Sequence, residues 1–108
     1  MDENKNFAVT MRQAVGFWER FAGFMLKKSA RYALLFENCA SIHTFFMRFN
    51  IDVVYLDKDK RIVAIKRNVK PWRVLLPVKS AVSIAEIPSY LNLQEKEIET
   101  LLQLTNNN

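Results

Sequence analysis

The stretch of sequence that decides the fold is CASIHTFFMRFNIDVVYLD, residues 39–57. It contains the only histidine of the chain, His43, and an acid, Asp52, set into an otherwise apolar run. Two strands can be drawn through it, over Ile42–Met47 and Ile51–Asp57. Neither strand alternates apolar with polar residues, as a strand with one wet face would. Both faces of both strands are therefore predicted to be covered by other parts of the chain.

Outward from this stretch, the pattern predicts a mainly β chain. Further extended segments are expected at residues 7–11, 32–36, 61–67, 73–79 and 80–87. The polar run Asp57–Lys60 separates two β-branched runs and is predicted to be a hairpin loop. Pro77 places its segment at the edge of a sheet, because proline cannot donate a ladder hydrogen bond.

A short helix is predicted near the N-terminus. Phe17, Phe21 and Phe24 follow one another at the spacing of one helix face. Gly16 and Gly23 weaken the helix by about 1 kcal/mol each if they are interior, so it should be short. We interpret the aromatic stripe as core packing.

The C-terminal segment has two interpretations. Asn92 followed by Glu95 resembles a capping box, and Ile98 with Leu102 fits helical spacing. The alternative is a turn at residues 95–97 and a final strand over 98–104. The helix is slightly favoured.

Size and composition indicate one domain, predicted at residues 7–104, with tails at 1–6 and 105–108. A single cysteine excludes an internal disulfide and fits a reducing compartment. No apolar run reaches the roughly 18–20 residues of a membrane-spanning helix, and no signal peptide is recognisable. A cytoplasmic location is therefore expected, without a transmembrane segment.

The net charge of +5 is concentrated in one segment. Residues 57–79 hold eight Lys and Arg against two Asp, so an anionic partner would meet the chain there. Specific nucleic-acid binding through residues 58–79 stays open but is disfavoured, because no nucleic-acid-binding motif accompanies the charge.

Metal and thiol chemistry are both disfavoured. No pair of residues has metal-ligand spacing, so neither a metal nor another cofactor is expected. Cys39 and His43 would lie about 13 Å apart in an extended segment, too far for a nucleophile and its base. Cys39 is interpreted as a buried structural residue.

His43, Asp52 and Glu86 are the best candidates for a shared site. If neighbouring strands bring His43 and Asp52 together, Asp52 could hold an imidazole proton, as in many acid–base sites. The alternative, which is favoured, is that Asp52 accepts main-chain hydrogen bonds and His43 is a satisfied, half-buried ring. Beside them, Arg48, Trp72 and Arg73 could grip a carboxylate or phosphate.

Several of these residues together resemble a family of bacterial and archaeal proteins, domain of unknown function 192. The resemblance spans roughly residues 7–104 and is carried by Arg20, Gly23, Phe24 and Met25, by Cys39, by the run from Ile42 to Asp57, by Pro71-Trp72-Arg73 and by Glu86-Ile87-Pro88. It implies a compact β-sandwich or barrel-like domain with a short N-terminal helix, and no biochemical activity. A bacterial source is expected. Turn glycines typical of the family are missing at Lys60 and at Lys96-Glu97, which favours the C-terminal helix.

The sequence thus predicts a small β-sandwich or barrel that acts as a binding or interaction module. Its partner is an unidentified small ligand or protein. The predicted binding residues surround a cleft for an anionic or polar ligand, and are His43, Arg48, Asp52, Trp72, Arg73 and Glu86. The rival hypothesis is a small enzyme that uses His43 and Asp52 as an acid–base pair.

Overall fold

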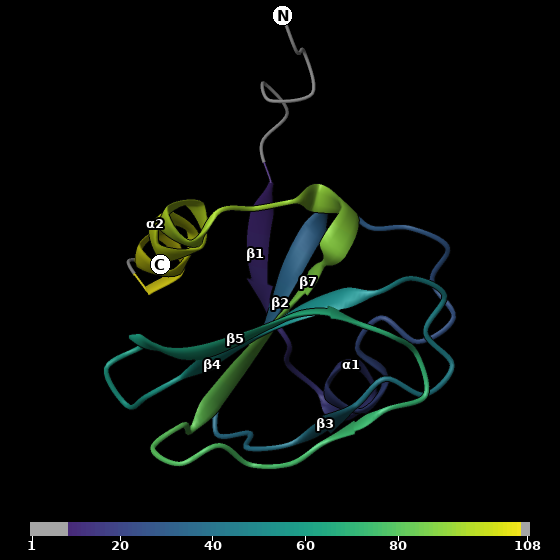
Figure 1. Cartoon of the computed structure of the whole chain (residues 1–108), viewed down its shortest axis with the longest axis horizontal. Helices are drawn as coiled ribbons and strands as arrows, with labels where there is room; N and C mark the ends of the chain where they lie inside the picture. The colour runs from purple at the N-terminus through teal and green to yellow at the C-terminus, as the bar shows by residue number, and fades with distance from the viewer. Residues whose placement is uncertain (1–8, 107–108) are drawn as a thin grey trace, which may run out of the picture.

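The structure, a computed structural model, describes residues 9–106. Its middle layer is a five-stranded sheet in the order β1-β2-β7-β4-β5, and a separate two-stranded ribbon pairs β3 with β6 (Figure 1). The strands are β1 (Thr10–Gln13), β2 (Tyr32–Phe36), β3 (Ile42–His43), β4 (Ile51–Leu56), β5 (Ile62–Val69), β6 (Val74–Leu75) and β7 (Ser83–Pro88). The helices are α1 (Phe17–Ala22), the 3-10 turn η2 (Ser89–Leu91) and α2 (Glu95–Asn106).

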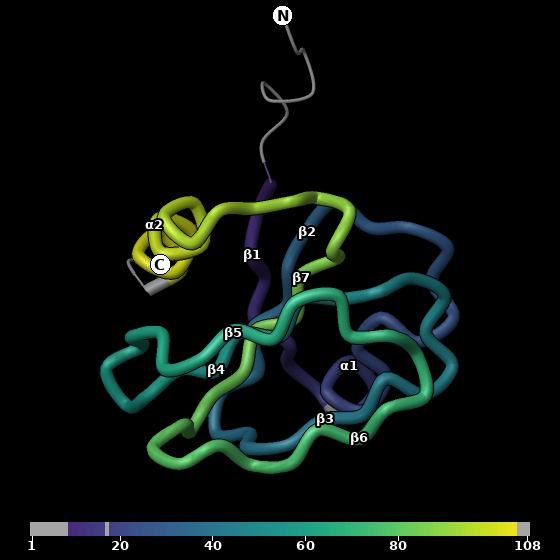
Figure 2. Tube along the Cα trace, viewed as in Figure 1, coloured from purple at the N-terminus to yellow at the C-terminus, as the bar shows by residue number. Residues whose placement is uncertain are grey.

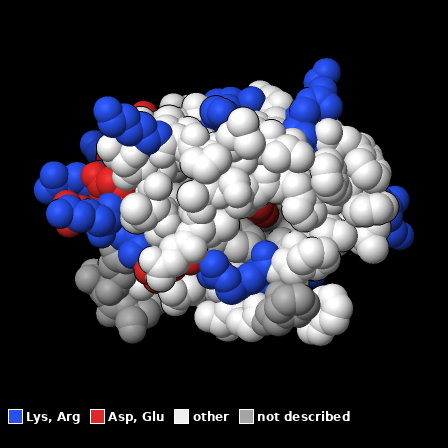
Figure 3. Space-filling model, turned by 90° about the horizontal axis from the view of Figure 1, so that it is seen from below, with Lys and Arg blue, Asp and Glu red and all other residues white. Residues whose placement is uncertain are grey.

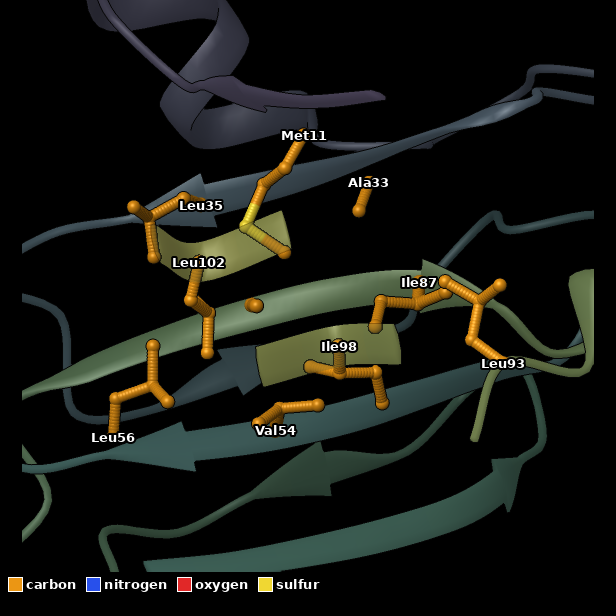
Figure 4. Close-up of a cluster of buried hydrophobic side chains, with 10 residues drawn as sticks. Met11, Ala33, Leu35, Val54, Leu56, Ile87, Leu93, Ile98 and Leu102 are labelled. Atoms are coloured by element: carbon orange, nitrogen blue, oxygen red, sulfur yellow. The ribbon is translucent and has the colours of Figure 1, made fainter. Parts of the chain in front are cut away.

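The two faces of the five-stranded sheet are covered by different elements. Helix α2 lies over one face, and α1 with the β3–β6 ribbon lies over the other (Figures 1 and 2). Ile98 and Leu102 of α2 pack against the sheet, where they meet Val54 and Leu56 of β4 (Figure 4). On the other face, Phe24 joins a second apolar core.

The central strands β4 and β7 are buried along their whole length. They pair antiparallel with each other and have further strands on their outer edges, so neither has a free edge. Both of their faces are covered by the two apolar cores. The prediction that Ile51–Asp57 is covered on both sides is therefore confirmed, and so is the mainly β fold class with a short N-terminal helix.

The other segment of the deciding stretch differs from its prediction. Only Ile42 and His43 form a strand, and the chain turns at Phe45 and Phe46. Thr44 is the cause, because its side chain is completely buried and its hydroxyl donates to the Lys70 carbonyl at 2.8 Å. The apolar run over Phe45–Met47 is thus a turn, and β3 itself is only half-buried.

The C-terminal segment is a helix, as favoured, but it starts and ends elsewhere. Gln94 precedes it, and the Gln94 amide donates to Glu97 Oε1 at 2.7 Å, which is one half of a capping box. Asn92 instead follows η2 in a left-handed conformation. The helix continues to Asn106, so the tail predicted from residue 105 is shorter than expected. Residues 7 and 8 of the predicted first strand lie outside the described residues.

Candidate functional site: a cavity over Glu86

Two buried acids lie on the paired strands β4 and β7 and point to opposite faces of the sheet. Because side chains alternate along a strand, Asp52 shares its face with Val54 and Leu56, the face that α2 covers. Glu86 pairs with Val53 in register and shares the face covered by α1 and the β3–β6 ribbon. The sheet therefore separates the two carboxyl groups.

Asp52 is satisfied by the protein itself. Its carboxylate is 3 % exposed and forms an ion pair with Arg67 at 2.9 Å. Oδ1 also accepts the Asn68 main-chain N–H at 2.9 Å and the Ser89 hydroxyl at 2.7 Å. A shallow cavity of about 550 Å³ lies beside these groups. These three contacts of Asp52 hold β4, β5 and η2 together, so the residue stabilises the fold.

His43 lies on the opposite side of the sheet from Asp52, so the contact between the two, which is the less favoured interpretation, is wrong. The favoured one, with Asp52 accepting a main-chain N–H and His43 half-buried, is what the structure has. The His43 ring instead accepts a hydrogen bond at Nδ1 from the Phe45 main-chain N–H, 3.1 Å away. In the neutral ring this leaves the proton on Nε2, which is then a donor. The imidazole therefore has neither an orienting carboxylate in Asp52 nor a free basic nitrogen, and the geometry gives no acid–base pair.

His43 and Glu86 share a second cavity, of about 150 Å³, beneath α1. Three separate parts of the chain line it: the α1 region, the segment around β3, and the strands β2 and β7. Figure 3 looks onto this side of the molecule and shows acidic atoms deep in a hollow among uncharged residues. The lining residues that matter for its chemistry are Arg20, Gly23, Cys39, His43, Met47 and Glu86.

The Glu86 carboxyl is buried without a partner. It is 2 % exposed, and Oε1 makes no hydrogen bond within the described residues. Burial, which disfavours the charged form, raises the pKa of Glu86 to about 8. The group is therefore a neutral carboxylic acid near pH 7, with one O–H to donate.

Gly23 provides the space that this carboxyl occupies. It follows α1 with φ +52° and ψ −122°, a backbone conformation that side chains disfavour. A Cβ at this position would lie 3.0 Å from Glu86 Oε1 and 3.5 Å from Phe36 Cζ. The missing side chain thus lets the turn after α1 pass directly over the carboxyl.

Two further groups define the wall of the cavity. The Arg20 guanidinium donates from Nη2 to the Glu37 carbonyl at 2.9 Å, which ties its head group to the end of β2. The Cys39 thiol donates to the Ser41 carbonyl at 3.2 Å, and burial raises the pKa of that thiol. A protonated thiol is a poor nucleophile, so the wall offers a cation and no activated sulfur.

The remaining predicted binding residues lie outside this cavity. Arg48, Trp72 and Arg73 are exposed, on loops that Thr44 fastens together through its contacts with Arg73 and Lys70. A row of rings connects them to the cavity: Phe45 stacks on His43 at 4.9 Å between centroids and on Trp72 at 5.6 Å. Of the six predicted residues, the structure therefore brings together only His43 and Glu86.

The basic segment 58–79 is distributed over the molecule. Lys60 pairs with Glu37 at 2.9 Å, and Arg67 is the partner of Asp52. The Lys66 ammonium lies 5.5 Å from the centre of the Tyr55 ring. Three of the eight basic residues of this segment thus make contacts with other side chains of the protein.

Residues 9–106 contain neither a cluster of metal ligands nor a membrane-spanning helix. No three His, Cys, Asp or Glu side chains of this part of the chain come close enough together to hold a metal ion. Within the same residues, no helix has the length and apolar character to cross a bilayer.

Sequence reasoning missed Arg20, Gly23 and Thr44 as residues that build this region. Two signals were available: a glycine directly after a short helix, and a threonine between His43 and two phenylalanines. Neither signal says what the residue contacts, because Gly23 and Glu86 are 63 positions apart in the chain.

The fold and the cavity define a small mainly β protein with a helix on each side of its sheet and a buried acid under one of them. Two solved structures share this fold. A protein of unknown function from Novosphingobium aromaticivorans aligns with a TM-score of 0.64, at 18% identity, over 75% of this chain and 64% of that one. A putative transcription regulator from Sinorhizobium meliloti aligns with a TM-score of 0.63, also at 18% identity, over 80% of this chain and 76% of that one. At this identity the likeness shows the fold alone.

The chain belongs to the domain of unknown function 192 family, described as "Uncharacterized ACR", whose model matches residues 1–102. The UPF0127 protein of Pyrococcus horikoshii is 41% identical over 96 residues, which cover 82% of each chain. The UPF0127 protein of Thermococcus kodakarensis is 44% identical over 67% of this chain.

The relatives from Thermococcus are longer than this chain. The match covers 49% of the Thermococcus kodakarensis protein and 56% of the Thermococcus sibiricus protein, so the chain spans about half their length. These relatives are archaeal and do not support the expected bacterial source.

Proposed function

We propose that this protein is a non-catalytic binding module, and that the cavity over Glu86 binds a small carboxylate. The observation that carries the proposal is the buried carboxyl of Glu86, whose Oε1 has no hydrogen-bond partner among the described residues. An unpartnered buried polar atom costs about 1–3 kcal/mol, and a ligand that hydrogen-bonds to the group would recover part of that cost.

The ligand class follows from the groups around the cavity, which are mainly hydrogen-bond donors. Glu86 is protonated near pH 7, Arg20 carries a permanent positive charge, and His43 has its proton on Nε2. Donors of this kind match a carboxylate, which accepts at two oxygens. A cationic ligand would have to approach Arg20 and ionise Glu86 first.

The ligand is small. A volume of about 150 Å³ corresponds to roughly five water molecules at about 30 Å³ each. Met47, Phe21 and Ile42 supply apolar wall, so a short hydrocarbon part is accommodated. Acetate and propionate fit this description, and a cavity of this volume also has room for a ring-sized acid such as benzoate.

A binding role is preferred over catalysis because the residues around the cavity supply no acid–base pair and no activated nucleophile. Asp52 faces the other side of the sheet, His43 Nδ1 is occupied by main chain, and the Cys39 thiol stays protonated. The cavity thus holds groups that bind and orient, and no activated nucleophile or base.

The test is a titration of ¹⁵N-labelled protein with acetate, propionate, benzoate and methylammonium, followed at the Gly23 amide by NMR. Saturable shifts with the three acids, and none with methylammonium, are expected. Glu86→Gln keeps a donor and a neutral group of the same shape, so it should bind these acids as the native chain does. Glu86→Leu removes the donor and should abolish the shifts.

The control is Glu99→Gln. It makes the same chemical change at an exposed position of α2, on the other side of the sheet from the cavity. Absence of saturation with every acid would overturn the proposal. So would binding of methylammonium that Glu86→Gln removes, because the cavity would then recognise cations.

A further inference from the structure

Three exposed hydrophobic residues lie side by side on the face formed by α1 and the β3–β6 ribbon. Leu26, Phe46 and Trp72 are 66%, 50% and 56% exposed. The Leu26 amide donates to the Phe46 carbonyl at 2.9 Å, and the rings of Phe46 and Trp72 are 4.7 Å apart between centroids. We call these three residues the apolar triad.

All three members of the apolar triad have left-handed backbones. Their φ angles are +64°, +63° and +67°, in a region that bulky side chains rarely adopt. Asparagine or glycine would be easier at each position. Three large apolar side chains held outward in this conformation indicate a use, because each remains at least half exposed despite the strain.

Hydrogen bonds to the buried Thr44 hold the loops that carry Phe46 and Trp72 together. The Trp72 amide donates to the Thr44 carbonyl at 3.0 Å, and the buried Thr44 hydroxyl accepts the Arg73 amide at 2.8 Å. The triad is therefore displayed by loops bonded to each other, in a defined arrangement. Exposed aliphatic residues extend the apolar surface along β6 and beyond it, at Val74 and Leu76.

The charge around the triad is mostly positive. Residues 20–31, 38–50 and 70–82, which carry the triad, hold eight Lys and Arg and no Asp or Glu. The acid of α1, Glu19, forms an ion pair with Arg12 at 2.6 Å. Figure 3 shows a broad, largely uncharged face with basic side chains around its rim, acidic atoms in its central hollow and a few acidic groups at one side. The basic residues of these segments are Arg20, Lys27, Lys28, Arg31, Arg48, Lys70, Arg73 and Lys79.

We propose that this face docks on an anionic phospholipid surface, with the apolar triad in the headgroup region and the basic rim on lipid phosphates. Protein surfaces that lie in a membrane interface combine Trp, Phe and Leu with Lys and Arg. Basic side chains near an anionic leaflet add attraction that salt screens. This inference does not depend on the ligand of the Glu86 cavity.

Two other occupants fit less well. A second copy of the chain would place basic rim against basic rim, which repels. A nucleic-acid strand would stack its bases on Phe46 and Trp72, but the rest of the apolar surface, Leu26, Val74 and Leu76, is aliphatic and offers no stacking face. Both remain distinguishable in the experiment below.

The test is co-sedimentation of the full chain with phosphatidylcholine vesicles that contain or lack phosphatidylglycerol. Binding to the anionic vesicles only, lost at high salt, is expected, with a blue shift of tryptophan fluorescence. Lys70→Gln with Arg73→Gln removes two charges and should weaken binding by roughly thirtyfold.

The decisive variant is Leu26→Asn with Phe46→Asn. It should lose vesicle binding while its melting temperature stays level or rises, since asparagine suits these backbones. Leu104→Asn, on exposed α2, is the matched control and should bind like the native chain.

The proposal is overturned if the native chain ignores anionic vesicles, or if the double asparagine variant still binds them. It is also overturned if the triad instead mediates a dimer, seen as a doubled mass in light scattering. Binding of a single-stranded oligonucleotide in place of vesicles would overturn it in the same way.

Discussion

Asp52 and Glu86, on the paired strands β4 and β7, face opposite sides of one sheet; Asp52 is hydrogen-bonded, and Glu86 Oε1 has no partner among residues 9–106. Two acidic residues of one sheet are thus placed in two environments. Asp52 is paired with Arg67, and Glu86 is left neutral under α1.

The first prediction concerns the pH dependence of stability. The pKa of Glu86 is about 8 in the folded chain and near 4.5 when the chain is unfolded. Between these values only the folded state holds the proton, so the free energy of unfolding falls as pH rises, by up to roughly 1.4 kcal/mol per unit. Below about 4.5 both states are protonated, and above about 8 neither is, so the effect is confined to this window.

Glu86→Gln carries no titrating proton. Its free energy of unfolding should therefore rise relative to that of the native chain between about pH 5 and pH 8. Urea denaturation at a series of pH values measures this difference, with Glu99→Gln as the control. A difference that stays constant with pH would show that Glu86 is ionised in the folded chain.

The second prediction concerns Gly23. Gly23→Ala places a methyl group 3.0 Å from Glu86 Oε1 in a disfavoured backbone conformation, and should cost about 1–3 kcal/mol. Gly16→Ala is a matched control, because Gly16 also has a positive φ, +83°, but has nothing within 4 Å of the added atom. Chemical denaturation of both variants should show the larger loss at Gly23. Equal losses would mean that the close approach to Glu86 is harmless.

The third prediction separates Asp52 from ligand binding. Asp52→Ala leaves the Asn68 amide, the Ser89 hydroxyl and Arg67 without their acceptor, and should destabilise the chain by about 2–4 kcal/mol. Acetate binding at the Glu86 cavity should be unchanged at temperatures where the variant is folded. Asp59→Ala, in the exposed hairpin loop, should change stability by less than about 0.5 kcal/mol. Loss of acetate binding in folded Asp52→Ala would contradict the assignment.

The fourth prediction concerns backbone strain. Leu26→Asn should stabilise the chain by about 1 kcal/mol, because asparagine tolerates the left-handed conformation and little apolar contact is lost at an exposed site. Leu104→Asn, in the regular helix α2, should instead be neutral or slightly destabilising. Thermal unfolding of the two variants checks both signs. A destabilised Leu26→Asn would mean that the leucine packs in solution more than its exposure indicates.

Much of the fold could be read from local pattern. The buried strand at Ile51–Leu56, the strand at Tyr32–Phe36 and the polar hairpin after Asp57 follow from short-range residue preferences, and the structure has them where the pattern places them. The strand predicted over Ile42–Met47 was wrong beyond His43, because an apolar stretch is compatible with a turn as well as with a strand. There the burial of Thr44 decided the outcome.

The sequence by itself determined that this chain is mainly β, that its central strand is covered on both faces, and that a few polar residues sit among core formers. Those properties depend on hydrophobicity and its period, which are local. Only the tertiary structure decided that Asp52 faces α2 while Glu86 faces α1, and that Gly23 and His43 join Glu86 around one cavity. The physical reason is that the partner of a buried polar group is set by strand pairing and by the layer that covers the sheet, and both come from residues far away in the chain.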